Sequence, residues 1–286
     1  MKQIGSRVWW WIDILLIRAR APFGGKDLRN TYAKLAWDAA RLGHVRGFLY
    51  AIRRVGDLEN APSGFIASVA LDYYELGFRG KAQGLFGRAL AKDQGDALFA
   101  LYYGTYLDRE GQAQEALPYL ERALAAMPND SVALAYLGHA HRHLDHPEEA
   151  KRCFRLSIRF GPNQGEPYES LAHLAADAQQ WEEAVECWQE ALIRMPNDPQ
   201  VLYNLGNALC ELKQYQGAVP AFRKALRQGW AEPHRAWYGL ALCYKNLGKK
   251  RRACKCCRKA LDLEAGYELA RTLMREIEES LRADLR

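Results

Sequence analysis

"LYNLGNALCELKQYQGAVPAFRKAL", residues 202 to 226, contains two apolar patterns separated by a polar stretch. Leu202 stands three residues before the large-small pair Leu205-Gly206, and Phe222 stands four residues after Ala218. Spacings of three and four place side chains on one face of an α-helix. The stretch therefore predicts two consecutive helices that touch each other through small residues.

The same pattern recurs along the chain at a fixed step. Large-small pairs of the first helix return in the neighbouring units, and "MPND" at 127 to 130 and at 195 to 198 predicts the end of a second helix. A regular period of about 34 residues is typical of repeat proteins. The recurring small residues of the second helix are 34 residues apart, with one final step of 35: Ala82, Ala116, Ala150, Ala184, Ala218 and Ala253.

The combined pattern, W-x-x-L-G-x-x-Y followed by A-x-x-x-F-x-x-A and a proline, resembles the tetratricopeptide repeat. The resemblance implies an all-α fold, a right-handed superhelical solenoid of helix-turn-helix repeats. Good copies start near Ser63, Ala97, Ser131, Gly165, Pro199 and His234, and a degenerate copy starts near Arg29.

Three segments are expected from this pattern. Residues 1–28 form an apolar N-terminal segment with basic flanks, which is either an anchor or a cap. Residues 29–267 hold six clear repeats and the degenerate one. Residues 268–286, with Leu269, Leu273, Ile277 and Leu281 at steps of four, predict an amphipathic helix that caps the open end of the stack.

Members of the family hold a partner peptide or helix in a concave groove lined by the first helices. The resemblance therefore implies a non-catalytic scaffold or adaptor whose partner is another protein. The expected lining of the groove is polar and aromatic with mixed charge, which suits a peptide better than a small metabolite. By analogy with the family, the groove residues are Tyr102, Thr105, Arg109, Tyr136, His139, His143, His173, Asp177, Tyr203, Asn207 and Glu211.

Histidines and cysteines invite a metal interpretation, which the spacing does not favour. His139, His143 and His173 share one expected face, yet no carboxylate or cysteine completes a recognised zinc spacing. "CKCC" at 254 to 257 falls on a second helix, where cysteine is expected to pack as a small hydrophobe. We expect no metal and no cofactor.

The seven cysteines are odd in number and unevenly spaced, which favours a reduced, cytoplasmic compartment over a disulfide framework. Equivalent places in adjacent repeats should be about 10 Å apart, too far for a disulfide. Cys153, Cys187 and Cys256 share one such place.

A basic stripe follows Gly248. Residues 245 to 261 carry eight Lys/Arg and no acid. A solvated outer face, an acidic protein or lipid surface, and nucleic acid all remain open, although the aromatic interleaving that base stacking requires is missing. A basic repeat protein that binds nucleic acid is thus the alternative function. The stripe consists of Lys249, Lys250, Arg251, Arg252, Lys255, Arg258 and Lys259.

Signatures of enzymes are absent from the sequence: there is no G-x-x-x-x-G-K, no G-x-S-x-G and no H-E-x-x-H. The composition, 49% hydrophobic and 26% charged, is that of a globular chain with a sizeable core. These features favour a binding protein over an enzyme, and they leave the oligomeric state open.

"VWWWIDILLI", residues 8 to 17, is too short to span a bilayer, since ten helical residues reach only about 15 Å. Asp13 makes spanning costlier still, and Pro22 argues against a cleaved leader. Two interpretations remain. Residues 1–22 attach the protein peripherally to the inner face of a membrane or to a partner, or they cap the stack of a soluble adaptor. The attaching side chains would be Trp9, Trp10, Trp11, Ile12, Leu15 and Leu16.

Overall fold

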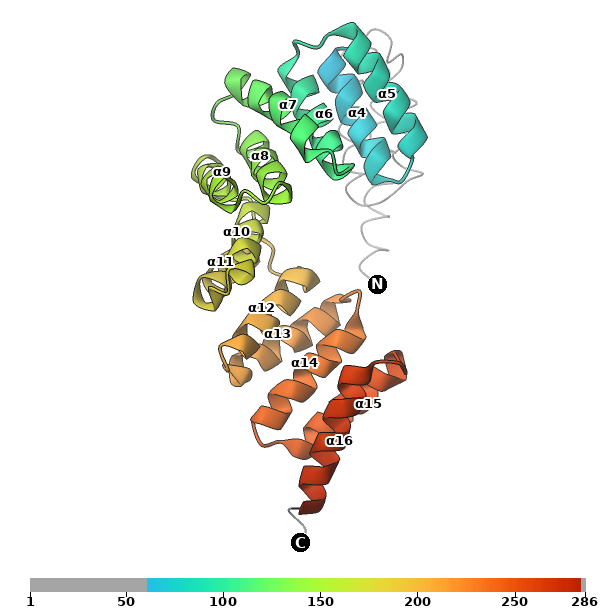
Figure 1. Ribbon diagram of the computed structural model, residues 1–286, viewed down its shortest axis with the longest axis vertical. Coiled ribbons are helices and arrows are strands. Elements are labelled where there is room, and N and C mark those ends of the chain that lie inside the picture. Colours follow the sequence, from blue (N-terminus) through green and yellow to red (C-terminus); the bar gives the residue numbers. More distant parts are fainter. Residues whose placement is uncertain (1–60, 284–286) are drawn as a thin grey trace, which may run out of the picture. The chain divides into compact units, whose positions relative to one another are not determined.

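The computed structural model describes residues 61–283, and these residues form helices joined by short turns (Figure 1). The described residues contain thirteen α-helices and no strand, which confirms the all-α repeat fold predicted from the sequence. Residues 1–28 and the degenerate repeat expected near Arg29 lie outside the described part. The helices are α4 Ser63–Glu75, α5 Arg79–Lys92, α6 Ala97–Arg109, α7 Ala113–Ala126, α8 Ser131–His143, α9 Pro147–Phe160, α10 Glu166–Asp177, α11 Trp181–Arg194, α12 Pro199–Glu211, α13 Tyr215–Gln228, α14 Pro233–Asn246, α15 Lys250–Leu263 and α16 Glu268–Ala283.

The helices belong to two compact units. The described part of unit 1, residues 61–126, holds α4 to α7, and that of unit 2, residues 127–283, holds α8 to α16. In both units each first helix packs against the second helix that follows it. The even-numbered helices α4 to α14 are the first helices, and they start within one residue of the repeat starts expected from the sequence.

Aspartates at the ends of the repeats start several first helices. The N-cap residues of α6, α8 and α12 are Asp96, Asp130 and Asp198. Their carboxylates accept hydrogen bonds from backbone N–H groups of the first helical turn. Such a cap satisfies donors that have no partner within the helix. Asp130 and Asp198 belong to the two "MPND" turns, so these turns both end one helix and start the next.

The turn between the two helices of each repeat requires a left-handed backbone. Glycine supplies it at Gly77, Gly111 and Gly248, where φ is 83°, 83° and 72°. In the three middle repeats the same place holds Asp145, Gln179 and Lys213, with φ of 58°, 58° and 57°. A side chain in this conformation costs roughly 1 to 2 kcal/mol relative to glycine. The middle repeats therefore keep the turn at the expense of local strain.

The two helices of a repeat approach closely because the first carries a small residue. A Cβ added at Gly206 would lie 2.8 Å from the ring of Phe222, and one added at Gly138 would lie 2.7 Å from the ring of Phe154. The ring of Phe222 also meets Gly239 of the following repeat, at 2.6 Å from an added Cβ. Phe222 is completely buried, and its ring packs against the glycines of two first helices.

Helix α16 packs against α15 and α14 and is the last helix of unit 2. Leu273 and Ile277 are buried, and Leu281 is half-buried. Leu269, which the step of four placed on the same face, is 56% exposed. The reason is its position in the first turn of α16, which begins only at Glu268.

Replacing Gln179 by glycine is expected to stabilise unit 2 by about 1 kcal/mol, because glycine adopts the left-handed turn without strain. Hydrogen exchange of the amides in α10 and α11 measures the effect. Gln189→Gly is the matched control: Gln189 is exposed within α11, where glycine should destabilise by about 1 kcal/mol. Equal effects of the two changes would refute strain at residue 179.

Replacing Gly206 by alanine should destabilise unit 2 by about 1 to 3 kcal/mol, because the added methyl group overlaps the buried ring of Phe222. Gly217→Ala is the control, since its added Cβ would meet Leu209 at an ordinary 3.6 Å and its helix α13 should gain up to about 1 kcal/mol. Hydrogen exchange in α12 and α13 separates the two. A Gly206→Ala variant as stable as the parent would show that the two helices can move apart.

Candidate functional site

The groove residues expected from the sequence all lie on first helices, but they divide between the two units. Tyr102, Thr105 and Arg109 belong to α6 of unit 1. The remaining eight belong to unit 2, on three successive first helices: Tyr136, His139 and His143 on α8, His173 and Asp177 on α10, and Tyr203, Asn207 and Glu211 on α12.

In unit 1, Thr105 does not fit the expected role. Its side chain is 1% exposed, and its hydroxyl donates a 2.8 Å hydrogen bond to the carbonyl oxygen of Leu101, within its own helix. The prediction that Thr105 faces a partner is therefore wrong for this structure. The analogy with the family gives the position of Thr105 along α6, and the structure shows that the side chain at this position is buried.

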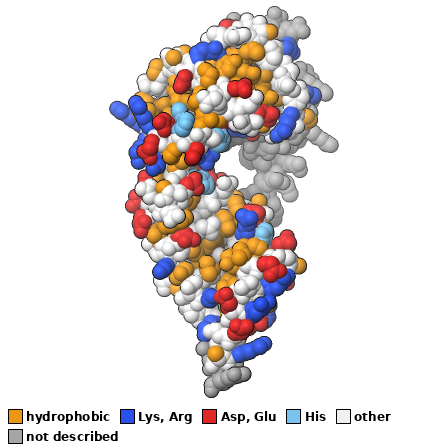
Figure 2. Space-filling view, viewed as in Figure 1, with side chains coloured by type: hydrophobic (Ala, Val, Ile, Leu, Met, Phe, Trp, Pro, Cys, Tyr) orange, Lys and Arg blue, Asp and Glu red, His pale blue; other side chains and the backbone are white. Residues whose placement is uncertain are grey.

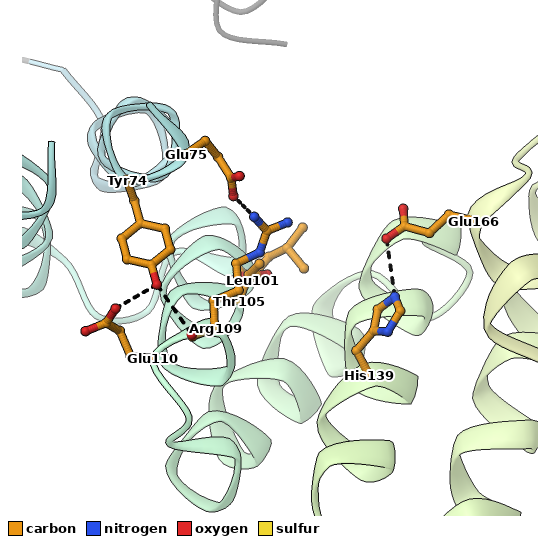
Figure 3. Close-up of polar contacts among 8 residues, drawn as sticks. All are labelled: Tyr74, Glu75, Leu101, Thr105, Arg109, Glu110, His139 and Glu166. Atoms are coloured by element: carbon orange, nitrogen blue, oxygen red, sulfur yellow. Dashed lines mark hydrogen bonds and ion pairs between the residues drawn. The ribbon is translucent and has the colours of Figure 1, made fainter. Parts of the chain in front are cut away.

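The other two residues of unit 1 are more accessible. Arg109 is exposed and forms an ion pair with Glu75 of α4 (Figure 3). Tyr102 is half-buried. Beside them the hydroxyl of Tyr74 donates a 2.6 Å hydrogen bond to Glu110, which raises the pKa of the tyrosine. These contacts tie α4 to the end of α6 and leave the outer side of Arg109 in solvent.

In unit 2, His139 is held between a ring and a carboxylate. Its imidazole lies edge-on to the ring of Phe154, with 5.1 Å between centroids. Its Nε2 lies 3.3 Å from a carboxylate oxygen of Glu166, at the start of the next first helix (Figure 3). The side chain remains 15% exposed. The Nε2 atom itself is buried and makes no hydrogen bond within the described residues, so only the rest of the imidazole reaches the surface where α8 meets α10.

His173 repeats this arrangement one unit later. Its imidazole lies edge-on to Trp188, at 5.6 Å, and its Nε2 lies 3.6 Å from Glu169 on the preceding turn of α10. The side chain is 32% exposed. The same two kinds of neighbour, an aromatic ring of the second helix and a carboxylate, thus orient both histidines.

The remaining groove residues of unit 2 differ in exposure. Tyr203 stacks on Trp230 at 4.8 Å between ring centroids, and it is half-buried, as are Asn207 and Tyr136. The three residues one turn further along their helices, His143, Asp177 and Glu211, are exposed. Polar groups therefore lie on every first helix from α8 to α12, with fixed side chains nearest the packed face.

The histidines do not assemble a metal site in the described residues. No group of three or more His, Cys, Asp or Glu side chains in residues 61–283 has the geometry to hold a metal ion. Instead, His139 and His173 each lie next to a different carboxylate, on Glu166 and Glu169. The arrangement can donate and accept hydrogen bonds, and it shows no grouping that would activate a nucleophile.

Most of the cysteines are buried packing residues, as expected. Burial raises the pKa of Cys153 and of Cys187 to about 11 and that of Cys257 to about 12. In "CKCC", Cys254 and Cys256 are also buried, and burial raises the pKa of each. Such thiols are poor nucleophiles at neutral pH.

The basic stripe lies along α15 and the turn before it. All of its side chains are exposed except Lys250, which is half-buried. Lys259 lies over the ring of Trp237, with 4.2 Å from Nζ to the ring centroid. A surface hollow of about 590 Å³ at the start of α15 is lined by Gly248, Lys249, Lys250, Arg251, Arg252 and Leu281.

Acidic side chains lie close to this stripe. On the face drawn in Figure 2, lysines and arginines are interspersed with aspartates and glutamates over the C-terminal helices. Lys245, for example, forms a 2.6 Å ion pair with Glu276 of α16. The surface is thus less uniformly positive than residues 245 to 261 suggest, because α16 brings acids beside them.

Two features of unit 2 were not foreseen from the sequence. The first is a group of half-buried aromatic residues around Tyr203, in which Tyr267 lies edge-on to Tyr238 at 5.5 Å and to His234 at 5.0 Å. The second is a contact between the sulfur atoms of Cys210 and Cys243. The high tyrosine content of the sequence is a signal for the aromatic group. The sulfur contact depends on how the two repeats pack against each other.

The sequence matches three family models, all described as tetratricopeptide repeat. One matches residues 70–131 and 170–233, a second matches 109–174, and a third matches 234–267. Together they run without a gap from residue 70 to residue 267. No curated protein matches the sequence.

Several solved structures share the fold. A structure titled "YrrB: a TPR protein with an unusual peptide-binding site" is 20% identical, with a TM-score of 0.58, and the match covers 66% of this chain and 97% of that one. PilF of Pseudomonas aeruginosa is 17% identical, with a TM-score of 0.66 and coverage of 77% and 100%. Cut9, in a complex with Hcn1, is 16% identical, with a TM-score of 0.70 and coverage of 91% and 50%.

Proposed function

The chain belongs to the tetratricopeptide repeat family, and from this premise we propose that unit 2 holds a peptide or short helix of a partner protein against its first helices α8, α10 and α12. Repeats of this family make the chain a protein-protein interaction scaffold. The finer proposal names the surface and the kind of ligand. The scaffold is non-catalytic and brings proteins together without transforming them.

The observation that carries the proposal is the matched placement of His139 and His173. Both imidazoles are partly exposed, and each packs edge-on against a ring of the second helix and lies within 3.6 Å of a carboxylate oxygen. Side chains that are already held in place lose less conformational entropy on binding. Two such groups on successive first helices offer an extended ligand two partly exposed imidazole rings.

The neighbouring residues indicate the chemistry of the ligand. Asn207 offers an amide that both donates and accepts, and Tyr203 offers a stiff aromatic face next to Trp230. The exposed carboxylates of Asp177 and Glu211 lie on the same helices. A peptide with polar side chains, at least one apolar anchor and basic groups opposite these carboxylates fits this surface.

Changing His139, His173 and Asn207 together to alanine should lower the affinity for the peptide by a factor of about 100 or more, the loss expected for several anchor contacts. Because the partner is not identified, ligands are first selected from a displayed library of random peptides on the full-length chain. The affinity of each selected peptide is then compared between the parent and the triple variant.

Three exposed residues of second helices provide the matched control. Arg152, Gln189 and Arg227 changed together to alanine should leave the affinity of the same peptides unchanged. Circular dichroism must show equal helical content in all three proteins. Peptides that bind the triple variant as tightly as the parent would place the binding surface elsewhere.

The second part of the proposal concerns attachment. We propose that the N-terminal segment holds the scaffold at the inner face of a membrane, so that complexes assemble there. The support is in the sequence alone: Trp9, Trp10 and Trp11 adjoin a branched apolar run, and Arg7 and Arg18 flank it. Within residues 61–283 no helix is long and apolar enough to cross a bilayer.

Liposome flotation tests the attachment. The full-length chain is expected to float with vesicles that contain anionic lipids, and a chain without residues 1–22 should remain in the dense fraction while keeping its helical content. A matched variant with Trp9, Trp10 and Trp11 changed to alanine should also fail to float. If the full-length chain does not float and the truncated chain aggregates, the segment is a cap of the stack and the attachment is refuted.

A further inference from the structure

The sulfur atoms of Cys210 and Cys243 lie 3.2 Å apart. Cys210 is one residue before the end of α12, and Cys243 is in the second half of α14. These two helices are the first helices of adjacent repeats, and the two cysteines are 33 residues apart in the chain. A disulfide bond is about 2.05 Å long, so the atoms need to approach by only about 1 Å.

The two thiols differ in accessibility. Cys243 is fully buried in the core of unit 2, whereas Cys210 is half-buried. We therefore expect a dissolved reagent to reach Cys210 before Cys243. Cys243 then lies directly behind it, already in contact and shielded from competing reactions.

The contact also polarises the pair. The contact between the two sulfur atoms lowers the pKa of the Cys210 thiol and raises the pKa of Cys243. The more accessible sulfur is thus the better nucleophile, and the thiolate is the form that attacks a disulfide. The pKa values of Cys187 and Cys257 are not lowered in this way, because burial raises both.

We propose that Cys210 and Cys243 form a reversible disulfide that links α12 to α14 when the protein meets a low-molecular-weight disulfide such as oxidised glutathione. The contact between the two sulfur atoms, with only one of them accessible, supports this assignment.

The reaction is a thiol-disulfide exchange in two steps. Cys210 loses its proton, its sulfur attacks one sulfur of glutathione disulfide, and the glutathione S–S bond breaks to release one glutathione thiolate. Cys243 then loses its proton and attacks the sulfur of Cys210, which breaks the mixed disulfide and releases the second thiolate. The released thiolates take up the two protons. The protein pair loses two electrons, and glutathione disulfide gains them.

The bond would join two first helices that carry the proposed binding surface or adjoin it. Asn207 lies three residues before Cys210 on α12. A covalent link to α14 would restrain α12 and so fix the position of this amide. The disulfide itself can be tested whether or not a peptide binds there.

The test exposes the folded full-length chain to buffers with increasing ratios of oxidised to reduced glutathione. Samples are quenched with acid, free thiols are alkylated, and the products are mapped by mass spectrometry. We expect five alkylated cysteines, a mass loss of about 2 Da at the remaining two, and one cross-linked peptide pair that contains Cys210 and Cys243. Excess reduced glutathione should restore both thiols.

Single substitutions sharpen the result. Cys243→Ser should stop the reaction at a glutathione adduct on Cys210, and Cys210→Ser should give neither the adduct nor the cross-link. Cys187→Ser is the matched control, which should form the cross-link as the parent does. Seven alkylated thiols in the parent under the most oxidising buffer, or a disulfide from Cys243 to Cys256, would overturn the proposal, provided that circular dichroism shows a folded chain.

Discussion

Close contact between a small residue of each first helix and a large side chain of the second helix is the constraint on which this structure depends. Gly104 receives Leu120, Gly138 receives Phe154, and Gly206 receives Phe222, with no room for an added methyl group. Burial of each large side chain supplies the hydrophobic free energy, and the missing side chain allows the helices to approach. The turn of the repeat must then bring the chain back sharply, even where Asp145, Gln179 or Lys213 replaces glycine.

This packing also determines what remains for function. A first helix packs against its partner helix and against neighbouring repeats, and side chains at the edge of these contacts are half-buried. His139, His173 and Asn207 occupy this border in unit 2, where a side chain is both oriented by the core and accessible to a ligand. Thr105 is instead buried, and its hydroxyl donates a hydrogen bond within its own helix.

The fold was predictable because its signals are local. The spacing of Leu205-Gly206 from Phe222 fits inside one repeat, and its return every 34 or 35 residues identifies the architecture without any knowledge of long-range contacts. The site was predictable only as positions on helices, and two outcomes show why. The burial of Thr105 and the contact of Cys210 with Cys243 depend on how neighbouring helices pack against one another, which no short pattern encodes.

The ring of Phe222 lies against Gly206 of its own repeat and against Gly239 of the next one. The repeating unit of the sequence is therefore not self-contained in its packing. A recombination event in the loop between α13 and α14 would separate the ring from its second glycine and set it against whatever residue the incoming repeat supplied at that place. Duplicated or shuffled copies of this repeat inherit a steric demand on their C-terminal neighbour, which restricts the order in which such repeats can follow one another.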